Sequence, residues 1–177
     1  MKKKYLAEYI RSVPGFPKEG IIFKDITTLL KDKDGLNDSL NQLLNFAKGK
    51  KIDKVVGIES RGFIYGALLA EKLNAGFVPI RKPGKLPAKT IKETYSLEYG
   101  EDSVEIHVDA IEKGDKILLH DDLLATGGTI EAACKLIENL GGEIVQISFL
   151  IELTFLKGKN KLNNYEVHSL IQYASEE

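Results

Sequence analysis

The sequence is poor in cysteine, in unbalanced charge and in long apolar runs, and each shortage excludes a class of protein. One cysteine, Cys134, stands among 177 residues, which excludes an intramolecular disulfide and a cysteine-based metal cage. We assign it to core packing. Lysine and arginine number 25 against 26 aspartates and glutamates, so no overall basic field favours nucleic acid. The longest apolar runs reach only about half of a membrane span.

Further absences bear on location and on metals. The start Met1-Lys2-Lys3-Lys4 leads into a mixed segment without the apolar core of a signal peptide, so we expect a cytoplasmic protein. His107, His120 and His168 are isolated and lack the spacing of a zinc site, and we interpret them as structural or solvent-facing. The chain shows no repeat, low-complexity tract or linker, and its length fits one domain over residues 1–177.

Short runs of branched apolar residues alternate along the chain with segments whose apolar residues recur at helical spacing. This alternation predicts an α/β fold, with a mainly parallel sheet between helices and ligands at the carboxyl ends of the strands. The predicted strands cover residues 54–58, 76–80, 117–119, 143–151 and, at the sheet edge, 165–171. The predicted helices cover residues 3–11, 34–47 with Asp34 as N-cap, 64–73 and 130–140. An ordered loop over 13–26 and a flexible two-stranded flap over 90–107 complete the prediction.

The stretch after strand 117–119 carries the most chemical information. Asp121 and Asp122 are followed by a small, flexible turn made of Ala125, Thr126, Gly127, Gly128 and Thr129. Backbone N–H groups, threonine hydroxyls and the positive end of the following helix favour a phosphate group at this turn. Two carboxylates repel a phosphate, so we expect them to accept hydrogen bonds from the vicinal hydroxyls of a sugar. Together the two features indicate a ribose 5-phosphate.

Two other loops follow predicted strands and carry cations. Ser60 and Arg61 follow strand 54–58 at the start of a helix, a combination suited to a second anion such as pyrophosphate. Arg81 and Lys85 lie in a basic loop directly after strand 76–80. A solvated surface turn is the plain alternative for the basic loop, but its place beside two inferred phosphate sites favours binding of a polyanion.

Three motifs resemble those of a known family. No lysine follows the glycines of the phosphate turn, and the spacing of a dinucleotide-binding loop is absent. The segment 120–129 instead resembles the phosphoribosyl-pyrophosphate signature of type I phosphoribosyltransferases. Its residues are most similar to those of one branch of that family, the adenine phosphoribosyltransferases. Glu59-Ser60-Arg61-Gly62-Phe63 resembles the pyrophosphate motif of that family, which is often built on a cis peptide bond. Ser96-Leu97-Glu98-Tyr99-Gly100 resembles its mobile catalytic loop.

The resemblance implies a fold, a reaction and partners. We expect the type I phosphoribosyltransferase fold with an N-terminal helix and purine-binding hood over residues 1–30 and a flexible flap over 82–107. The implied reaction serves purine salvage: the 5-phosphoribosyl group passes from phosphoribosyl pyrophosphate to adenine, giving AMP and pyrophosphate. We expect Mg²⁺ to arrive on the substrate phosphates without a dedicated set of protein ligands. The implied assembly is a homodimer in which the basic loop from Arg81 to Lys85 reaches the neighbouring site.

The resemblance also assigns roles to individual residues. The expected catalytic residues are Glu98, Tyr99 and Arg61; the expected pyrophosphate contacts are Ser60, Arg61, Arg81 and Lys85; and the expected adenine contacts are Ile22, Phe23 and Lys24. The phosphate turn and the two aspartates hold the ribose 5-phosphate. This chain has Lys24 where the family more often has arginine, and Pro83 where it usually has a further basic residue.

Two alternatives stay open. The first is the same reaction on a 6-oxopurine such as hypoxanthine, guanine or xanthine; the N-terminal hood favours adenine. The second is a non-catalytic sensor of phosphoribosyl pyrophosphate that regulates transcription, for which we would expect an added DNA-binding module or a strongly basic face. The short, charge-balanced chain and its intact flap motif favour the enzyme.

Overall fold

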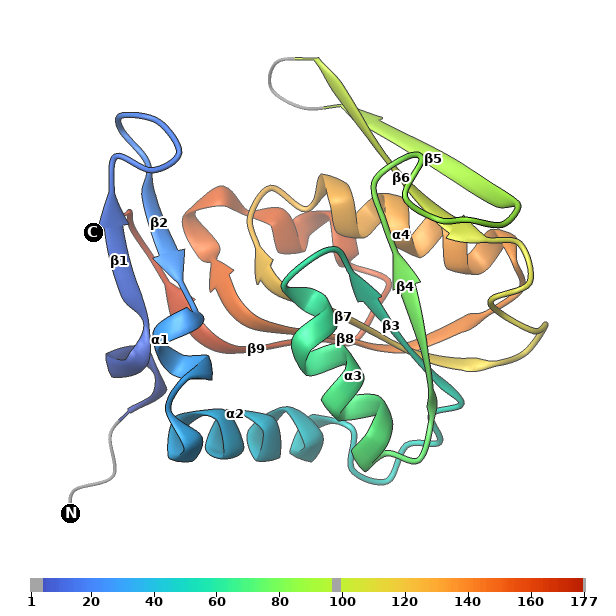
Figure 1. Ribbon diagram of the computed structural model, residues 1–177, viewed down its shortest axis with the longest axis horizontal. Helices are drawn as coiled ribbons and strands as arrows, with labels where there is room; N and C mark the ends of the chain where they lie inside the picture. Colours follow the sequence, from blue (N-terminus) through green and yellow to red (C-terminus); the bar gives the residue numbers. More distant parts are fainter. Residues whose placement is uncertain (1–4, 97–99, 177) are drawn as a thin grey trace.

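A parallel five-stranded sheet forms the centre of the molecule (Figure 1). The computed structural model describes residues 5–96 and 100–176. The strands of the sheet lie in the order β4 (Gly76–Ile80), β3 (Lys54–Ile58), β7 (Lys116–Leu124), β8 (Glu143–Leu153) and β9 (Val167–Tyr173). Strands 54–58 and 76–80 have the predicted bounds. The predicted α/β fold is confirmed.

Helices cover both faces of the sheet (Figure 1). α2 (Lys33–Phe46) and α3 (Gly62–Lys72) pack on one face, and α4 (Gly128–Asn139) packs on the other. Neighbouring strand residues divide between the two cores: Leu118 faces the first and Leu119 the second. Because both faces are buried, the strands are continuously apolar, which is why short branched runs were sufficient to locate them.

Two antiparallel hairpins lie outside the central sheet. β1 (Arg11–Pro14) pairs with β2 (Ile22–Asp25), and β5 (Thr90–Ser96) pairs with β6 (Glu101–His107). The second hairpin confirms the two-stranded flap, which lies over α4 (Figure 1). The remaining short helices are η1 (Leu6–Tyr9), α1 (Thr27–Leu30), η2 (Thr154–Leu156) and η3 (Gly158–Leu162). Within the part of the chain that is described, no helix is long and apolar enough to cross a membrane.

The N-terminal predictions need correction. The helix expected over 3–11 is wrong for its described residues 5–11: they form the 3₁₀ turn η1, and the chain extends from Arg11 because it pairs there with β2. The region 13–26 is likewise not only a loop, since its second half supplies β2. The N-cap of α2 is Asp32 rather than Asp34, because the Asp32 carboxylate accepts the N–H groups of Asp34 and Gly35.

Strand β7 is longer than the apolar run that predicted it. It continues through Asp121 and Asp122 to Leu124, because the parallel ladder with β8 extends as far as Leu124 and Glu152. The two aspartates therefore belong to the strand and not to the loop after it. Their side chains are held on a rigid element, which fixes their position better than a flexible turn would.

The order of the strands locates a crevice. From β3 the chain continues to β4 on one side of the sheet, and β7 then takes the other side of β3. In open α/β sheets, ligands bind at the carboxyl ends of the strands where the order reverses in this way. The carboxyl ends of β3 and β7 are followed by the loops that start at Glu59 and at Ala125.

Candidate active site

One cavity lies at the carboxyl ends of β3 and β7. It encloses about 410 Å³ and brings together the pyrophosphate motif, both aspartates and the end of the phosphate turn. Its lining residues are Ile58, Glu59, Ser60, Arg61, Lys82, Asp121, Asp122, Leu123 and Thr129. Five of the predicted residues therefore line one cavity, namely Ser60, Arg61, Asp121, Asp122 and Thr129, whereas Arg81 and Lys85 are not in its lining.

The phosphate turn connects β7 to α4 beside this cavity. A smaller hollow of about 80 Å³ is lined by residues 123–130 and Asp121. Gly127 adopts a φ of 83°, a conformation that favours glycine, and α4 begins at Gly128. The helix therefore points its free N–H groups and its positive end at the turn, as an anion site requires.

Gly158 supports the phosphate turn from behind. A Cβ at Gly158 would lie 2.1 Å from the Ala125 carbonyl oxygen, and one at Gly127 would lie 2.6 Å from the Gly158 carbonyl oxygen. Backbone therefore packs directly on backbone, and a side chain at either position would displace the turn. Sequence reasoning missed Gly158 because its partner lies on another element.

The carboxyl groups of Asp121 and Asp122 are held close to each other. Burial, together with the neighbouring Asp122 charge, raises the pKa of Asp121 well above its usual range. Burial also raises the pKa of Asp122, and the Arg61 guanidinium opposes that shift. Arg61 Nε lies 2.6 Å from Asp122 Oδ2. The ion pair fixes the arginine of the pyrophosphate motif against one of the expected ribose ligands.

The pyrophosphate motif also contacts the hood. The peptide bond between Glu59 and Ser60 is cis, as the family motif led us to expect. The Arg61 guanidinium lies 4.7 Å from the centroid of the Phe23 ring, a cation–π contact. Phe23 therefore joins the hood to the edge of the cavity through Arg61.

Glu59 holds the basic loop. Its carboxylate accepts hydrogen bonds from Lys85 Nζ at 2.5 Å, from the Lys82 N–H at 3.0 Å and from the Arg81 guanidinium at 3.3 Å. Burial tends to raise the pKa of Glu59, but these donors prevail and lower it to about 2. Arg81 and Lys85, the expected pyrophosphate contacts, thus lie together at the cavity edge and share one counter-charge.

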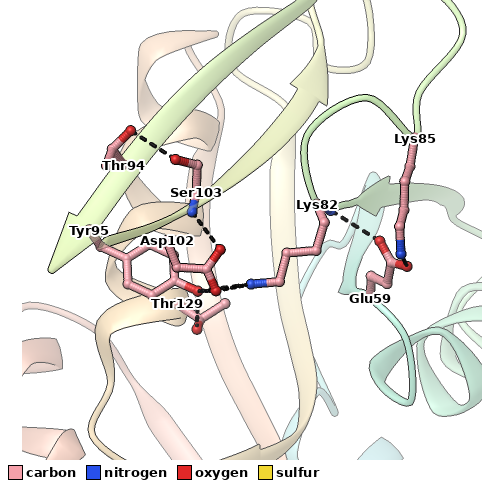
Figure 2. A network of polar contacts seen from close by, with 8 residues as sticks. All are labelled: Glu59, Lys82, Lys85, Thr94, Tyr95, Asp102, Ser103 and Thr129. Atoms are coloured by element: carbon pink, nitrogen blue, oxygen red, sulfur yellow. Dashed lines mark hydrogen bonds and ion pairs between the residues drawn. The ribbon is translucent and has the colours of Figure 1, made fainter. Parts of the chain in front are cut away.

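The flap is tied to both other loops (Figure 2). Lys82 of the basic loop forms an ion pair with Asp102 of β6. The Tyr95 hydroxyl, from β5, accepts a hydrogen bond from Thr129 Oγ1 at 2.9 Å and donates to Asp102 Oδ2 at 3.2 Å. No sequence pattern marks these contacts, which only the folded hairpin creates.

The hood residues differ in what their side chains contact. Ile22, Phe23 and Lys24 all lie on β2. The Lys24 side chain is buried, donates to Ser12 Oγ at 3.1 Å and lies 4.3 Å from the Tyr173 ring centroid. Its ammonium therefore stabilises the hood, which leaves only the backbone of Lys24 for the expected contact with adenine.

The remaining predicted residues fall outside the site or outside the described chain. Glu98 and Tyr99 lie outside the described residues, so their expected roles stay predictions. Cys134 packs in the core as predicted, and burial raises its thiol pKa to about 12. His120 lies next to the aspartates in β7 and is fully buried, and this burial lowers its pKa to about 3. His168 stacks on Phe46, far along the chain from these loops.

The donor set fits a magnesium ion only with help from a substrate. Among residues 5–96 and 100–176, no group of three or more histidine, cysteine, aspartate or glutamate side chains is placed to hold a metal. Mg²⁺ commonly takes one or two carboxylates and completes its octahedron with phosphate oxygens and water. Asp121 and Asp122 line the cavity and are the carboxylates near which such an ion would lie.

Comparison with known proteins assigns the family. Residues 24–171 match the family described as Phosphoribosyl transferase domain. An adenine phosphoribosyltransferase of Flavobacterium johnsoniae is 58% identical over 168 residues, which are 95% of this chain and 99% of that protein. The chain belongs to the adenine phosphoribosyltransferase family. The resemblance of its three motifs is thereby confirmed.

Solved structures of adenine phosphoribosyltransferases have the same fold. The enzyme of Thermoanaerobacter pseudethanolicus superimposes with a TM-score of 0.93 at 53% identity, covering 95% of this chain and 98% of that one. The Giardia lamblia enzyme, complexed with 9-deazaadenine, gives a TM-score of 0.90 at 38% identity and covers 98% and 100% of the two chains. The type I phosphoribosyltransferase fold therefore extends over nearly the whole chain.

Proposed function

We propose that this protein transfers the 5-phosphoribosyl group from phosphoribosyl pyrophosphate to adenine, giving AMP and pyrophosphate in purine salvage. One observation carries the proposal: Thr129 at the end of the phosphate turn, the carboxylate pair and the Ser60–Arg61 motif line a single cavity, and the rest of the turn lines a hollow that shares Asp121 and Thr129 with it. These three sites match the 5-phosphate, the ribose hydroxyls and the pyrophosphate of one substrate. The 9-deazaadenine bound to the Giardia relative supports adenine as the base.

The cations of the site act on the leaving group. The bond between the anomeric carbon and the pyrophosphate oxygen breaks, and negative charge develops on pyrophosphate. Arg61, Arg81 and Lys85 stabilise this charge more in the transition state than in the ground state, which accelerates the reaction. Arg61 is held for this task by Asp122 and Phe23, so that little reorganisation is needed.

The other half of the reaction joins the purine to the sugar. A ring nitrogen of adenine attacks the anomeric carbon, whose transition state resembles an oxocarbenium ion, and the nitrogen then loses its proton. We propose that Glu98 takes part in the transfer of this proton and that Tyr99 closes over the site. Asp121 and Asp122 orient the ribose through its hydroxyls, and the flap excludes water that would hydrolyse the sugar.

The proposal includes a metal and an assembly. Mg²⁺ would arrive on the phosphates of the substrate, with Asp121 or Asp122 at most near it, and would neutralise charge on those phosphates. We further propose a cytoplasmic homodimer in which the loop from Arg81 to Lys85 reaches the neighbouring site. In its own chain this loop lies against Glu59, at the edge of the cavity.

A purine competition tests the function. The purified protein is given Mg²⁺, phosphoribosyl pyrophosphate and equal amounts of adenine, hypoxanthine, guanine and xanthine, and the nucleotides are separated by chromatography. We expect AMP as the dominant product. Another monophosphate would overturn the base specificity but keep the mechanism. Binding of phosphoribosyl pyrophosphate without any nucleotide product would favour the sensor.

A further inference from the structure

Tyr95 lies where the flap, the basic loop and the phosphate turn meet. It is the second-last residue of β5, and its ring packs so closely on Gly128 that a Cβ there would lie 3.0 Å from Tyr95 Cδ2. Figure 2 shows its hydroxyl pointing at Thr129 with Lys82 and Asp102 beside it. One phenol thus connects three segments that are separate in the sequence.

The donors and acceptors of this cluster follow from the chemistry of its groups. The Tyr95 oxygen accepts from Thr129 Oγ1 at 2.9 Å and from Lys82 Nζ at 3.3 Å, and its own proton goes to Asp102 at 3.2 Å. A carboxylate is a stronger acceptor than a neutral hydroxyl, so the Tyr95 hydroxyl donates its proton to Asp102 and not to Thr129. Thr129 has a single hydroxyl proton, and Tyr95 is its acceptor.

A phosphate in the turn needs that same proton. Thr129 is one of the expected 5-phosphate ligands, and a phosphate oxygen is charged, which makes it a stronger acceptor than a phenol. We propose that Tyr95 is a positioning residue whose hydroxyl competes with the substrate 5-phosphate for the Thr129 proton and thereby lowers the affinity of the turn for phosphate. The inference rests on the proposed function, because it takes Thr129 to be a phosphate ligand.

The exchange leaves the hairpin in place. The Tyr95 ring stays on Gly128, Glu93 of β5 stays paired with Lys135 of α4, and Val104 and Ile106 of β6 stay buried in the core. The Tyr95 hydroxyl therefore acts on the affinity for phosphate and not on the position of the flap.

A double-mutant cycle with ribose 5-phosphate as the probe tests the competition. Tyr95→Phe keeps the ring on Gly128 but removes the competing acceptor, so calorimetry should give a dissociation constant roughly threefold to tenfold lower, the size of one neutral hydrogen bond. In a Thr129→Val background the same change should have no effect, since no hydroxyl proton remains to be contested. An equal effect in both backgrounds, or weaker binding by Tyr95→Phe, would overturn the inference.

A matched control distinguishes the effect of losing the Tyr95 hydroxyl from that of a general loss of structure. Tyr165 also donates its hydroxyl to a carboxylate, that of Glu138 at 2.7 Å on the last turn of α4, away from the phosphate turn. Tyr165→Phe should leave the dissociation constant of ribose 5-phosphate unchanged. A comparable gain from Tyr165→Phe would show that loosening α4, and not the Thr129 proton, controls affinity.

A second measurement separates this inference from the proposed function. AMP synthesis is assayed in the same preparations in which the binding of ribose 5-phosphate is measured. An unchanged dissociation constant in Tyr95→Phe, with AMP still formed by the wild type, would overturn the inference and leave the proposed function intact. Failure of ribose 5-phosphate to bind at all, together with no AMP formation, would overturn both.

Discussion

Two neighbouring carboxyl groups, those of Asp121 and Asp122, lie in the interior beside one arginine. A charge that is buried without full compensation destabilises the folded state. The protein keeps this arrangement where the sugar hydroxyls are expected, so binding capacity and stability oppose each other at these residues. The opposition can be measured one residue at a time.

Asp121→Asn should stabilise the fold while it weakens sugar binding. Because the folded-state pKa of Asp121 is raised, its contribution to stability is complete below the unfolded pKa near 4 and is lost as pH rises through the folded pKa. We therefore expect the variant to melt roughly 2–8 °C above the wild type at pH 7, for a gain of about 1–2 kcal/mol, and to match it near pH 3.

The comparison is made by thermal unfolding at several pH values, with Asp109→Asn as control. Asp109 is exposed, so its replacement should leave the melting temperature unchanged at each pH. If Asp121→Asn melts below the wild type at pH 7, this would contradict the interpretation that the Asp121 carboxylate destabilises the folded protein.

Glu59→Gln should strengthen binding of pyrophosphate. Glu59 neutralises Arg81 and Lys85 in the free protein, so an incoming anion must compete with it. Glutamine keeps an acceptor oxygen but removes the repelling charge. The dissociation constant for pyrophosphate should fall about tenfold, as expected for one unit charge at 5–6 Å in a partly exposed site.

Titration calorimetry checks this result, with Glu105→Gln as the matched variant. The Glu105 carboxylate accepts the Gly84 N–H of the same loop at 3.2 Å, and an unchanged constant is expected there. Weaker pyrophosphate binding in Glu59→Gln would instead mean that Glu59 acts by holding the cations in place.

Among the elements, the sheet was predictable and the contacts between loops were not. β3 and β4 were found with their bounds because buried parallel strands form apolar runs. The length of β7 was missed because its last residues are acidic, although the ladder with β8 includes them. The hairpin of β1 and β2 was missed because prolines and glycines concealed its alternation.

The phosphate turn depends on a second element for its shape. Gly158→Ala would place a Cβ against the Ala125 carbonyl oxygen and the Gly127 nitrogen, and backbone atoms cannot move aside cheaply. We expect the KM for phosphoribosyl pyrophosphate to rise about tenfold to hundredfold, with little change in the KM for adenine.

Steady-state kinetics with each substrate varied in turn measures this split. Gly76→Ala is a suitable control, because its nearest neighbour would be Lys54 Cγ at 3.5 Å, an ordinary contact. A folded Gly158→Ala enzyme with an unaltered KM for phosphoribosyl pyrophosphate would exclude the glycine as a support of the turn.

At the scale of the whole molecule, the site is assembled from loops far apart in the chain. The sequence identified most cavity residues, since their chemistry is local and their strands are parallel. It did not identify Glu59 as the partner of the basic loop or Tyr95 as the partner of Thr129, because such pairs depend on tertiary distances. The roles of Glu98 and Tyr99 stay predictions.

The proposed dimer can be tested by complementation. One chain carries Arg81→Ala with Lys85→Ala, the other Asp121→Asn with Asp122→Asn, and differently tagged copies are co-expressed so that only mixed dimers are purified. If the basic loop serves the neighbouring site, one of the two sites is intact and about half of the wild-type activity should return.

The alternative outcomes are equally clear. If the loop serves its own chain, where it contacts Glu59, neither site is complete and the mixed dimers stay inactive. Failure to recover any mixed dimer, together with a monomer mass in sedimentation, would contradict the assembly itself.

β2 and the end of β9 meet at the hood, where Lys24 of β2 lies over Tyr173 (Figure 1). A ribosome makes the Tyr173 ring roughly ten seconds or more after Lys24 at ordinary rates of synthesis. Until then the Lys24 ammonium lacks the aromatic cover that it has in the finished protein. The proposed purine-recognition end of the enzyme is therefore completed only after the strands that carry the phosphate turn and the carboxylate pair have been made.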